Sequence, residues 1–296
     1  MNWKGVFPAL TTPFTDKDTL DLVMLEKSVR SQTEAGVHGL ILGGTLGEAS
    51  TLRFEEKETL VRNTLNYVNG TIPVILNIAE GSLHEALRQV KAAESWGVSG
   101  FMLLPPMRYY ADARETIQYF RQIAESTSLP FMIYNNPVDY KIEVTLDMFE
   151  ALAKVKNIES VKESTREVTN ITRMINAFGD RFQILCGVDT LALESLALGA
   201  CGWVAGLVCA FPKETMAVYN HFQRGEWQKA LDIYRWFLPL LELDLHPKLV
   251  QYIKLAASIE GIGSEFVRPP RLVLEWEEKS RIEQIIRETL KTRPAV

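Results

Sequence analysis

The amino-acid sequence predicts an α/β fold, a (β/α)8 TIM barrel with a C-terminal helical appendage, on three observations. A Gly-x-x-Gly pattern followed by an apolar run recurs at residues 36–42, 97–104 and 199–205. Each copy indicates a helix that ends at glycine and then a buried strand, so the chain is built of βα units. The apolar runs do not alternate with polar residues, which is typical of parallel strands covered on both faces. Eight such runs, separated by helical segments, match this barrel in number and order.

The expected strands and helices alternate along the first two thirds of the chain. The strands lie at residues 6–10, 39–42, 74–78, 100–104, 131–135, 160–163, 183–186 and 203–206. Periodic apolar residues indicate helices at residues 22–29, 53–67, 82–96, 114–126, 146–155, 169–178 and 191–198. Thr145 is a good N-cap for the helix that follows it. An open doubly wound sheet is the alternative architecture, and it fits less well because no Gly-x-Gly-x-x-Gly follows the first strand.

Beyond residue 212 the strand signals stop. Further helices are expected, and they lie at residues 214–222, 227–241, 248–259 and 276–290. The first of them completes the barrel, and the others form the appendage. We therefore expect a barrel over residues 1–224 and a C-terminal helical region over residues 225–296.

Composition excludes several classes of function. The chain of 296 residues carries a formal net charge of -5, and such mild acidity offers no footprint for nucleic acid or an anionic membrane. The three cysteines form no Cys-x-x-Cys pair, and the four histidines show no metal-ligand spacing. Residues 195–212 are uncharged but contain glycines, so we interpret them as a helix end, a turn and a buried strand. The N-terminus has no signal-peptide pattern, and we expect a cytoplasmic protein.

Lys162 is the residue around which the chain is organised. Residues 160–164 lie between two helical runs, so Lys162 is expected on a short interior strand with its side chain on the same face as Ser160 and Ser164. Burial disfavours the charged form of a lysine and leaves a neutral amine that can attack a carbonyl. The alternative for a lone lysine is a surface position at a loop.

Two further groups stand at strand ends, where the active sites of such barrels lie. Residues 43–48 read Gly-Gly-Thr-Leu-Gly-Glu, and successive amides at such a turn can bind an anion such as a carboxylate. The alternative is a glycine turn that serves only the geometry of the chain. Tyr134 ends the fifth strand and is expected to face the barrel mouth, where a phenol can pass protons. The alternative for Tyr134 is a residue of the core.

Together these features resemble the dihydrodipicolinate synthase / N-acetylneuraminate lyase superfamily of Schiff-base-forming barrel enzymes. The resemblance covers nearly the whole chain, and the C-terminal helices are also like those of the family. Its motifs are the N-terminal run at residues 5–14, the Gly-Thr-x-Gly-Glu turn at residues 44–48, Tyr-Asn-x-Pro at residues 134–137 and Val-Lys-Glu at residues 161–163.

The resemblance implies a mechanism and a set of site residues. Lys162 would form an imine with a 2-oxo acid or a related carbonyl substrate, and Tyr134 would shuttle protons. The amides and the hydroxyl near Thr45 would hold the substrate carboxylate, and Asp189 and Val204 would line the pocket. No metal or organic cofactor would be needed, since an iminium is itself an electron sink. The family also implies a homo-oligomer, a tetramer or a dimer, that binds a small molecule and neither nucleic acid nor membrane.

The chain departs from the synthase pattern at three places. Leu46 stands in the substrate-binding turn where many members have a second threonine, and Met107 takes the place of a relay tyrosine after the fourth strand. Asp139 replaces an arginine two residues past the Tyr-Asn-x-Pro proline, and it would repel the carboxylate of an amino-acid aldehyde. Arg108 is the neighbouring cation that can compensate, and Tyr109 is another candidate for a missing group. These departures put the synthase reaction in doubt and leave the imine chemistry untouched.

A subgroup with Gly-Thr-Leu-Gly-Glu and Pro-Pro-x-Arg-Tyr looks closer to this chain. Some of its members are described as deaminating 1-pyrroline-4-hydroxy-2-carboxylate, and this is the reaction that we expect first. The alternatives are 4-hydroxy-tetrahydrodipicolinate synthase or another 2-oxo acid aldolase and, from a different class, a non-catalytic sensor that binds a keto acid. Glu163 is expected to point away from the pocket, as a buried charge without an evident role.

Overall fold

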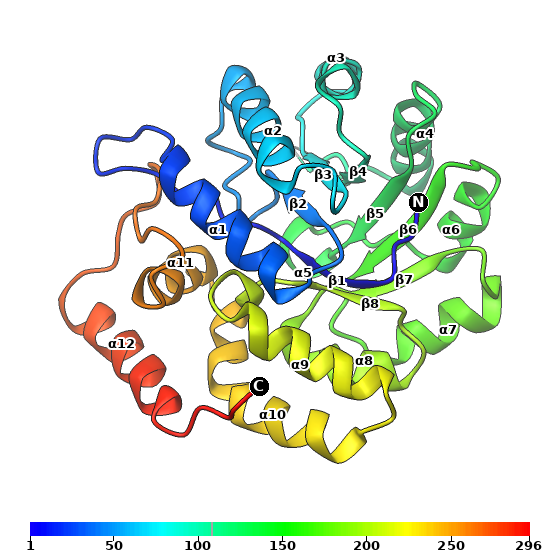
Figure 1. The fold of residues 1–296 in the computed structure, drawn as a ribbon. Coiled ribbons are helices and arrows are strands. Elements are labelled where there is room, and N and C mark those ends of the chain that lie inside the picture. Colours follow the sequence, from blue (N-terminus) through cyan, green and yellow to red (C-terminus); the bar gives the residue numbers. More distant parts are fainter. Residues whose placement is uncertain (108) are drawn as a thin grey trace.

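The computed structural model describes residues 1–107 and 109–296, and its centre is a barrel of eight parallel strands (Figure 1). The strands are β1 (Gly5–Pro8), β2 (Leu40–Leu42), β3 (Val74–Ile78), β4 (Gly100–Leu103), β5 (Phe131–Asn135), β6 (Ile158–Glu163), β7 (Gln183–Cys186) and β8 (Gly202–Ala205). Their order is β1-β8-β7-β6-β5-β4-β3-β2. The ring closes between β1 and β2, where the His38 amide donates to the Val6 carbonyl and the Leu10 amide donates to the Ile41 carbonyl, both at 2.9 Å. The predicted barrel is confirmed.

Helices surround the barrel in the order that the sequence predicts, with ends that shift by a few residues. They are α1 (Leu22–Ala35), α2 (Phe54–Val68), α3 (Leu83–Trp96), α4 (Ala113–Ala124), α6 (Leu146–Leu152), α7 (Thr169–Phe178), α8 (Ala192–Ala197) and α9 (Pro212–Gln223). Thr145 holds the N-cap position of α6, but its side chain makes no capping hydrogen bond. The one-turn helix α5 (Pro137–Tyr140) was not predicted; Asn136 caps it by accepting the Asp139 amide at 3.2 Å.

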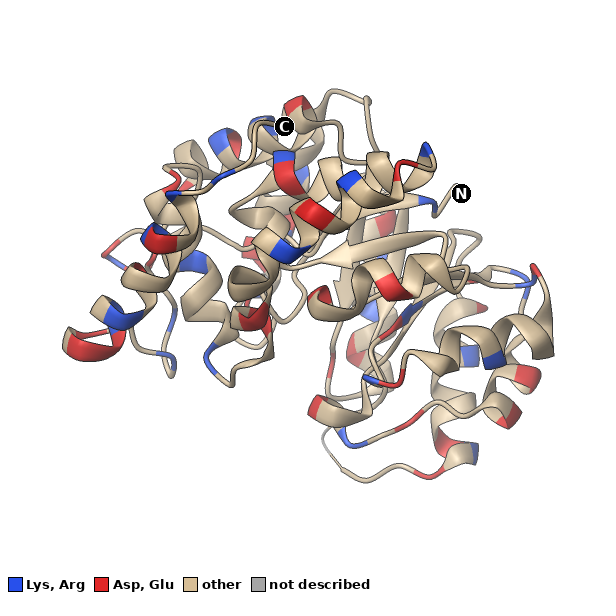
Figure 2. Ribbon diagram, turned by 90° about the horizontal axis from the view of Figure 1, so that it is seen from below, with Lys and Arg blue, Asp and Glu red and all other residues tan. Residues whose placement is uncertain are grey.

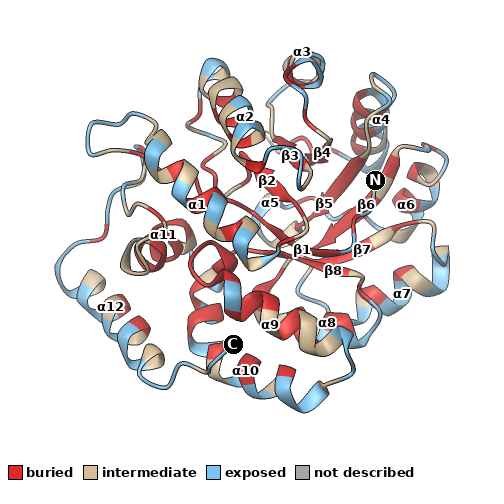
Figure 3. Ribbon diagram, in the orientation of Figure 1, coloured by how far each residue is buried: buried red, intermediate tan, exposed pale blue. Residues whose placement is uncertain are grey.

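Local sequence signals explain where the longer helices begin and end. Asp21 accepts the Met24 amide at 2.9 Å and starts α1, and Gly36, with φ of 84°, ends it in a left-handed conformation that suits glycine. The strands are buried along almost their whole length, whereas the helices are buried only on the faces that meet them (Figure 3). This is the burial expected of parallel strands enclosed by helices, because both faces of the sheet are removed from water.

The C-terminal helices pack against one side of the barrel. They are α10 (Trp227–Leu241), the short 3-10 helix η3 (Glu242–Leu245), α11 (Leu249–Ile259) and α12 (Trp276–Leu290). Figure 1 shows α10 beside α9, with α11 and α12 completing the same side. The segment η3 turns the chain from α10 into α11 and lies against the 3-10 helix η1 (Asp189–Leu191), which follows β7. The appendage therefore reaches the end of the barrel where the strands finish.

A buried ion pair joins the appendage to the turn after β2. Lys254 of α11 donates to Glu48 Oε1 at 2.8 Å and to the Thr12 carbonyl at 2.9 Å, and Glu48 Oε2 accepts the Arg268 amide at 3.1 Å. The Lys254 and Glu48 side chains are 1% and 0% exposed. Burial lowers the pKa of Lys254 to about 8, while the charge of Glu48 opposes this shift. The pair thus fixes the turn after β2 to the C-terminal helices.

Charges of the described residues are spread over the outer elements. Figure 2 shows lysines and arginines interspersed with aspartates and glutamates along the helices. This distribution agrees with the mild net charge, which predicts no nucleic-acid footprint. In the described part of the chain, every helix is too short or too polar to cross a lipid bilayer.

We expect Lys254→Met to lower the free energy of unfolding by about 3 kcal/mol, because it removes the nearer of the two cations beside the buried Glu48 and leaves only Arg271, at 3.6 Å. Urea denaturation followed by circular dichroism measures the loss. Arg30→Met is the matched control, since it breaks the exposed pair between Arg30 and Glu26 (2.7 Å) and should cost below about 1 kcal/mol. Equal losses in the two variants would show that the buried pair does not hold the appendage.

Candidate active site

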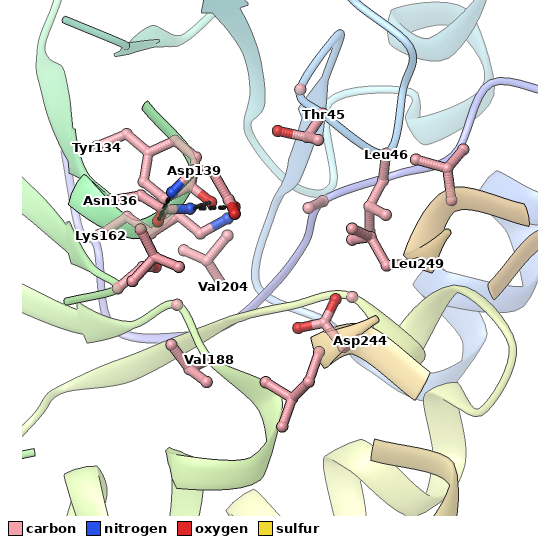
Figure 4. Close-up of a pocket in the computed structure, with 18 of the residues that line it drawn as sticks. Thr45, Leu46, Tyr134, Asn136, Asp139, Lys162, Val188, Val204, Asp244 and Leu249 are labelled. Carbon is pink, nitrogen blue, oxygen red and sulfur yellow. Dashed lines mark hydrogen bonds between the residues drawn. The ribbon is translucent and has the colours of Figure 1, made fainter. Parts of the chain in front are cut away.

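A cavity of about 460 Å³ opens at the carboxyl ends of the strands, where the sequence places the site (Figure 4). It is lined by the turn after β2, by β5 and β6, by the turns after β7 and β8, and by the segment from η3 to α11. It brings together most of the predicted site residues, which are Thr45, Leu46, Tyr134, Asp139, Lys162 and Val204. The predicted role of Arg108 lies outside the described residues.

Lys162 faces this cavity from β6. It pairs in the sheet with Tyr134 of β5, and its Nζ lies 4.0 Å from the centroid of the Tyr134 ring. Only 6% of Lys162 is exposed, and burial lowers the pKa of its amine, while the nearby Tyr140, Asp244 and Asp189 oppose that shift. A lowered pKa raises the fraction of neutral amine, which is the form that attacks a carbonyl.

Gly187, directly after β7, leaves the space that the β6 side chains occupy. A Cβ atom at this position would lie 2.6 Å from Lys162 Cγ and 2.1 Å from Ser164 Oγ. Ser164 is 2% exposed and lines the cavity, and its hydroxyl forms no hydrogen bond with the described residues, although it lies near enough to Tyr134 to affect the pKa of that phenol. The strand alternation that places Lys162 on the cavity face predicts the same face for Ser164.

Asn136 links Tyr134 to Asp139. Its Nδ2 donates to the Tyr134 hydroxyl at 3.0 Å and to Asp139 Oδ2 at 2.7 Å, and both bonds are drawn in Figure 4. Burial raises the pKa of Tyr134, and the hydrogen bond from Asn136 opposes this. Tyr134 is therefore a neutral phenol that can donate a proton to an acceptor beside Lys162.

Tyr140 packs against two residues that line the cavity, and its place there was not predicted from the sequence. Its hydroxyl is hydrogen-bonded to the hydroxyl of Thr45, and its ring meets that of Tyr134 edge to face, with centroids 5.5 Å apart. Burial raises the pKa of Tyr140, and Tyr134 raises it further. The position after β4 that was expected to supply such a tyrosine holds Met107, so the structure supplies a second phenol from α5 instead. The sequence did not point to Tyr140 because the short helix α5, which carries it, was not predicted.

The structure corrects the predicted role of Asp189. Its carboxylate lies behind the cavity wall, where it accepts hydrogen bonds from Trp203 Nε1 at 2.8 Å, the Gly206 amide at 3.0 Å and the Leu207 amide at 2.7 Å. Burial raises the pKa of Asp189, and these donors oppose the rise. Asp189 thus holds the turn after β8 and acts on Lys162 only through its charge.

Asp244 lines the cavity and was not predicted. It belongs to η3, in a region without a recognised motif, and Figure 4 shows it projecting into the space that Lys162 faces from the other side. Burial and the charge of Asp189 raise the pKa of Asp244 to about 8, while Lys162 opposes the rise. Only the packing of the appendage brings this carboxyl group to the site.

Glu163 now has a structural role. It points away from the cavity, where Oε1 accepts the Thr165 amide at 2.8 Å and Oε2 accepts from Asn170 at 2.9 Å and Asn135 at 3.3 Å. Burial raises the pKa of Glu163, and these donors oppose the rise. The buried carboxyl group therefore ties β5, β6 and α7 together behind Lys162.

Fold and site together define a (β/α)8-barrel protein with a small-molecule cavity at the carboxyl ends of its strands. Over the described residues, no group of three or more His, Cys, Asp or Glu is placed to hold a metal ion. Residues 2–289 match the model of the dihydrodipicolinate synthetase family. The chain belongs to that family, whose proteins are enzymes of small-molecule metabolism.

Individual relatives agree with this assignment. The chain is 30% identical to a 4-hydroxy-tetrahydrodipicolinate synthase of Exiguobacterium sibiricum, over 92% of each chain. It is 29% identical to a protein of the same name from Methanothrix thermoacetophila, over 96% of each chain. Among solved structures, it is similar to a dihydrodipicolinate synthase of Bacillus anthracis, with a TM-score of 0.93, 28% identity and 100% of each chain covered.

Under the imine chemistry that the family resemblance implies for Lys162, Tyr140→Phe should slow imine formation with pyruvate by on the order of 10²-fold, the usual contribution of a positioned proton donor. The ring and its packing remain, so the melting temperature should stay unchanged. Borohydride trapping in a single turnover measures the rate. Tyr219→Phe is the control, because the Tyr219 hydroxyl bonds to the Cys201 carbonyl (3.5 Å), which precedes β8 at the opposite end of the barrel. A normal rate in Tyr140→Phe would return Tyr140 to a packing role.

Proposed function

We propose that the protein is an imine-forming lyase that acts through Lys162 on a 2-oxo acid or a cyclic imine carboxylate, with 1-pyrroline-4-hydroxy-2-carboxylate deaminase as the specific activity. The observation that carries the proposal is the buried Lys162 amine beside the Tyr134 ring, at 4.0 Å, in a cavity that the Thr45 turn also lines. A neutral amine, phenols and backbone amides are the groups that imine chemistry on a carboxylate substrate uses.

The first stage forms the imine. The amides and the hydroxyl at Thr45 hold the substrate carboxylate, as a turn with free amides suits an anion. The Lys162 amine adds to C2 of the cyclic imine, and Tyr134 gives a proton to the ring nitrogen. The ring C2–N bond then breaks, which leaves an iminium on Lys162 and a free amino group on C5.

The second stage removes the hydroxyl and amino groups. A proton leaves C3, drawn by the iminium, and the C4 hydroxyl departs as water. Proton transfer from C5 to C3 then gives an enamine across C4 and C5. Protonation of C4 and loss of a proton from the nitrogen convert this enamine into an imine at C5. One water hydrolyses this imine and releases ammonia, and a second water releases the product from Lys162. The sum consumes one water and yields ammonia and 2,5-dioxopentanoate, with Tyr134, Tyr140 and Thr45 as the hydroxyl groups available to carry protons.

The second candidate is 4-hydroxy-tetrahydrodipicolinate synthase, and the names of the similar proteins favour it. That reaction joins pyruvate to aspartate semialdehyde, whose carboxylate needs a cation at the pocket mouth. Here Asp139 lines the cavity at the corresponding position and is held by Asn136 at 2.7 Å. A carboxylate at that place repels the second substrate, which is why we rank the synthase behind a lyase with a single substrate. A cytoplasmic location and a homo-oligomer remain predictions, as does catalysis against the sensor alternative.

Borohydride with pyruvate should reduce an imine on Lys162, and peptide mass should locate the adduct there. Because burial lowers the pKa of Lys162, the neutral fraction should rise with pH through a midpoint below the value of about 10.4 of an ordinary lysine. The initial trapping rate, measured from pH 6 to about 10, gives that midpoint. Lys162→Met is the control. An adduct on another lysine, or no adduct at all, would contradict an imine mechanism at Lys162 and favour the non-catalytic sensor.

Parallel assays decide between the two reactions. We expect ammonia release from 1-pyrroline-4-hydroxy-2-carboxylate at a rate at least about a hundredfold above condensation of pyruvate with aspartate semialdehyde, since loss of a charge-assisted pair costs a few kcal/mol. Coupled dehydrogenase assays follow ammonia and the condensation product separately. Condensation at the faster rate, with no ammonia from the pyrroline, would establish the synthase instead.

A further inference from the structure

We infer that Asp244 is a specificity-determining residue: together with Asp139 it selects a substrate whose end remote from the reacting carbonyl carries a hydroxyl or amino donor, and it rejects a second carboxylate there. The inference rests on the proposed imine chemistry of Lys162 and names the substrate class of that site. It assigns a binding function to the C-terminal appendage, a region that contains none of the sequence motifs found in the barrel.

The fold makes room for the Asp244 carboxylate at the cavity. A Cβ atom at Gly206 would lie 2.8 Å from Asp244 Oδ1, so the carboxylate sits directly over the backbone that follows β8. Gly206 has φ of -96°, an ordinary value for any residue, so only the space explains why a glycine suits this position.

Acidic groups face Asp244, and a backbone hydrogen bond from Asp189 offsets part of their effect. Asp189 and Asp139 act on it as like charges, and Lys162 is the cation that opposes them. Once Lys162 has formed an imine with the substrate, its positive charge is shared with the substrate carbon. A hydroxyl or amino group of the ligand can bond to Asp244 in either protonation state. A ligand carboxylate meets Asp139 on one side of the cavity and, above a pH of about 8, an ionised Asp244 on the other.

Other basic side chains that line the cavity are held elsewhere or lie at its edge. Arg271 Nη1 lies 3.6 Å from Glu48 Oε2, and His246 stacks on Tyr252 with ring centroids 4.6 Å apart. Arg166 is exposed, with a left-handed φ of 65°, and it is the competing candidate for binding a remote carboxylate.

A second, independent observation points to a ligand in the same space. The Ser164 hydroxyl is buried, lines the cavity and is without a hydrogen-bond partner among the described residues. A buried hydroxyl without a partner costs free energy in the empty site, and a polar ligand group removes that cost. Ser164 and Asp244 therefore offer polar contacts to one ligand, beyond those that hold its carboxylate at Thr45.

The test uses three five-carbon acids that differ only at C5: 5-hydroxy-2-oxopentanoate, 2-oxopentanoate and 2-oxoglutarate. Borohydride trapping on Lys162 of the full-length protein gives an apparent affinity and a maximal rate for each, and pyruvate tests imine formation by itself. We expect the hydroxylated acid to bind best and 2-oxoglutarate worst, with on the order of 10-fold between neighbours, the scale of one hydrogen bond to a charged group.

Asp244→Ala should lower the preference for the hydroxylated acid over 2-oxopentanoate about tenfold, chiefly through affinity. It should also reduce the difference in affinity between the hydroxylated acid and 2-oxoglutarate. Asp244→Asn should keep part of the preference. Asp232→Asn, an exposed acid on α10 that accepts from Gln228 at 2.7 Å, is the matched control, and thermal melting checks that each variant folds. A wild-type preference for 2-oxoglutarate that Arg166→Gln abolishes, or an equal loss for all acids in Asp244→Ala, would overturn the inference. Failure of pyruvate to trap would instead count against the proposed function.

Discussion

The buried pair between Glu48 and Lys254 is the constraint on which the cavity depends. Two charges removed from water are tolerated only when each is satisfied, and here the Thr12 carbonyl and the Arg268 amide complete their hydrogen bonds. The pair joins the turn that lines one wall of the cavity to the helices that supply another. The cavity is therefore built by the barrel and the appendage together.

Within that frame, the chemistry of the site follows from burial. A lysine on an interior strand cannot keep an ordinary pKa, and the same desolvation raises the pKa of both tyrosines and of Asp244. The groups around the amine are thus kept near their neutral forms, which is the state in which they can exchange protons. Reactivity here results from an environment that many elements share, and no single motif contains it.

The structure also shows how the residues that depart from the synthase pattern are arranged around one another. A methionine replaces one expected tyrosine, but Tyr140 brings another phenol to Thr45 from a different element. An arginine is lost at position 139, but the aspartate there is held by Asn136, which also holds Tyr134. These side chains form two hydrogen-bonded groups that meet where the rings of Tyr134 and Tyr140 pack edge to face. Together they change the charge at the cavity mouth and keep hydroxyl groups beside Lys162.

The sequence by itself determined the barrel, the strand that carries Lys162, and the positions of the Thr45 turn and of Tyr134. These features could be predicted because apolar periodicity and helix-ending glycines are local signals. Tertiary structure alone decided three things. Asp189 does not line the cavity, because the amides after β8 bind its carboxylate. Tyr140 lies beside the cavity on a one-turn helix that is too short to show a periodic signal. Asp244 lines the cavity from a segment that is remote in sequence. Hydrogen-bond capture and packing between distant segments are long-range effects, and residue spacing along the chain does not encode them.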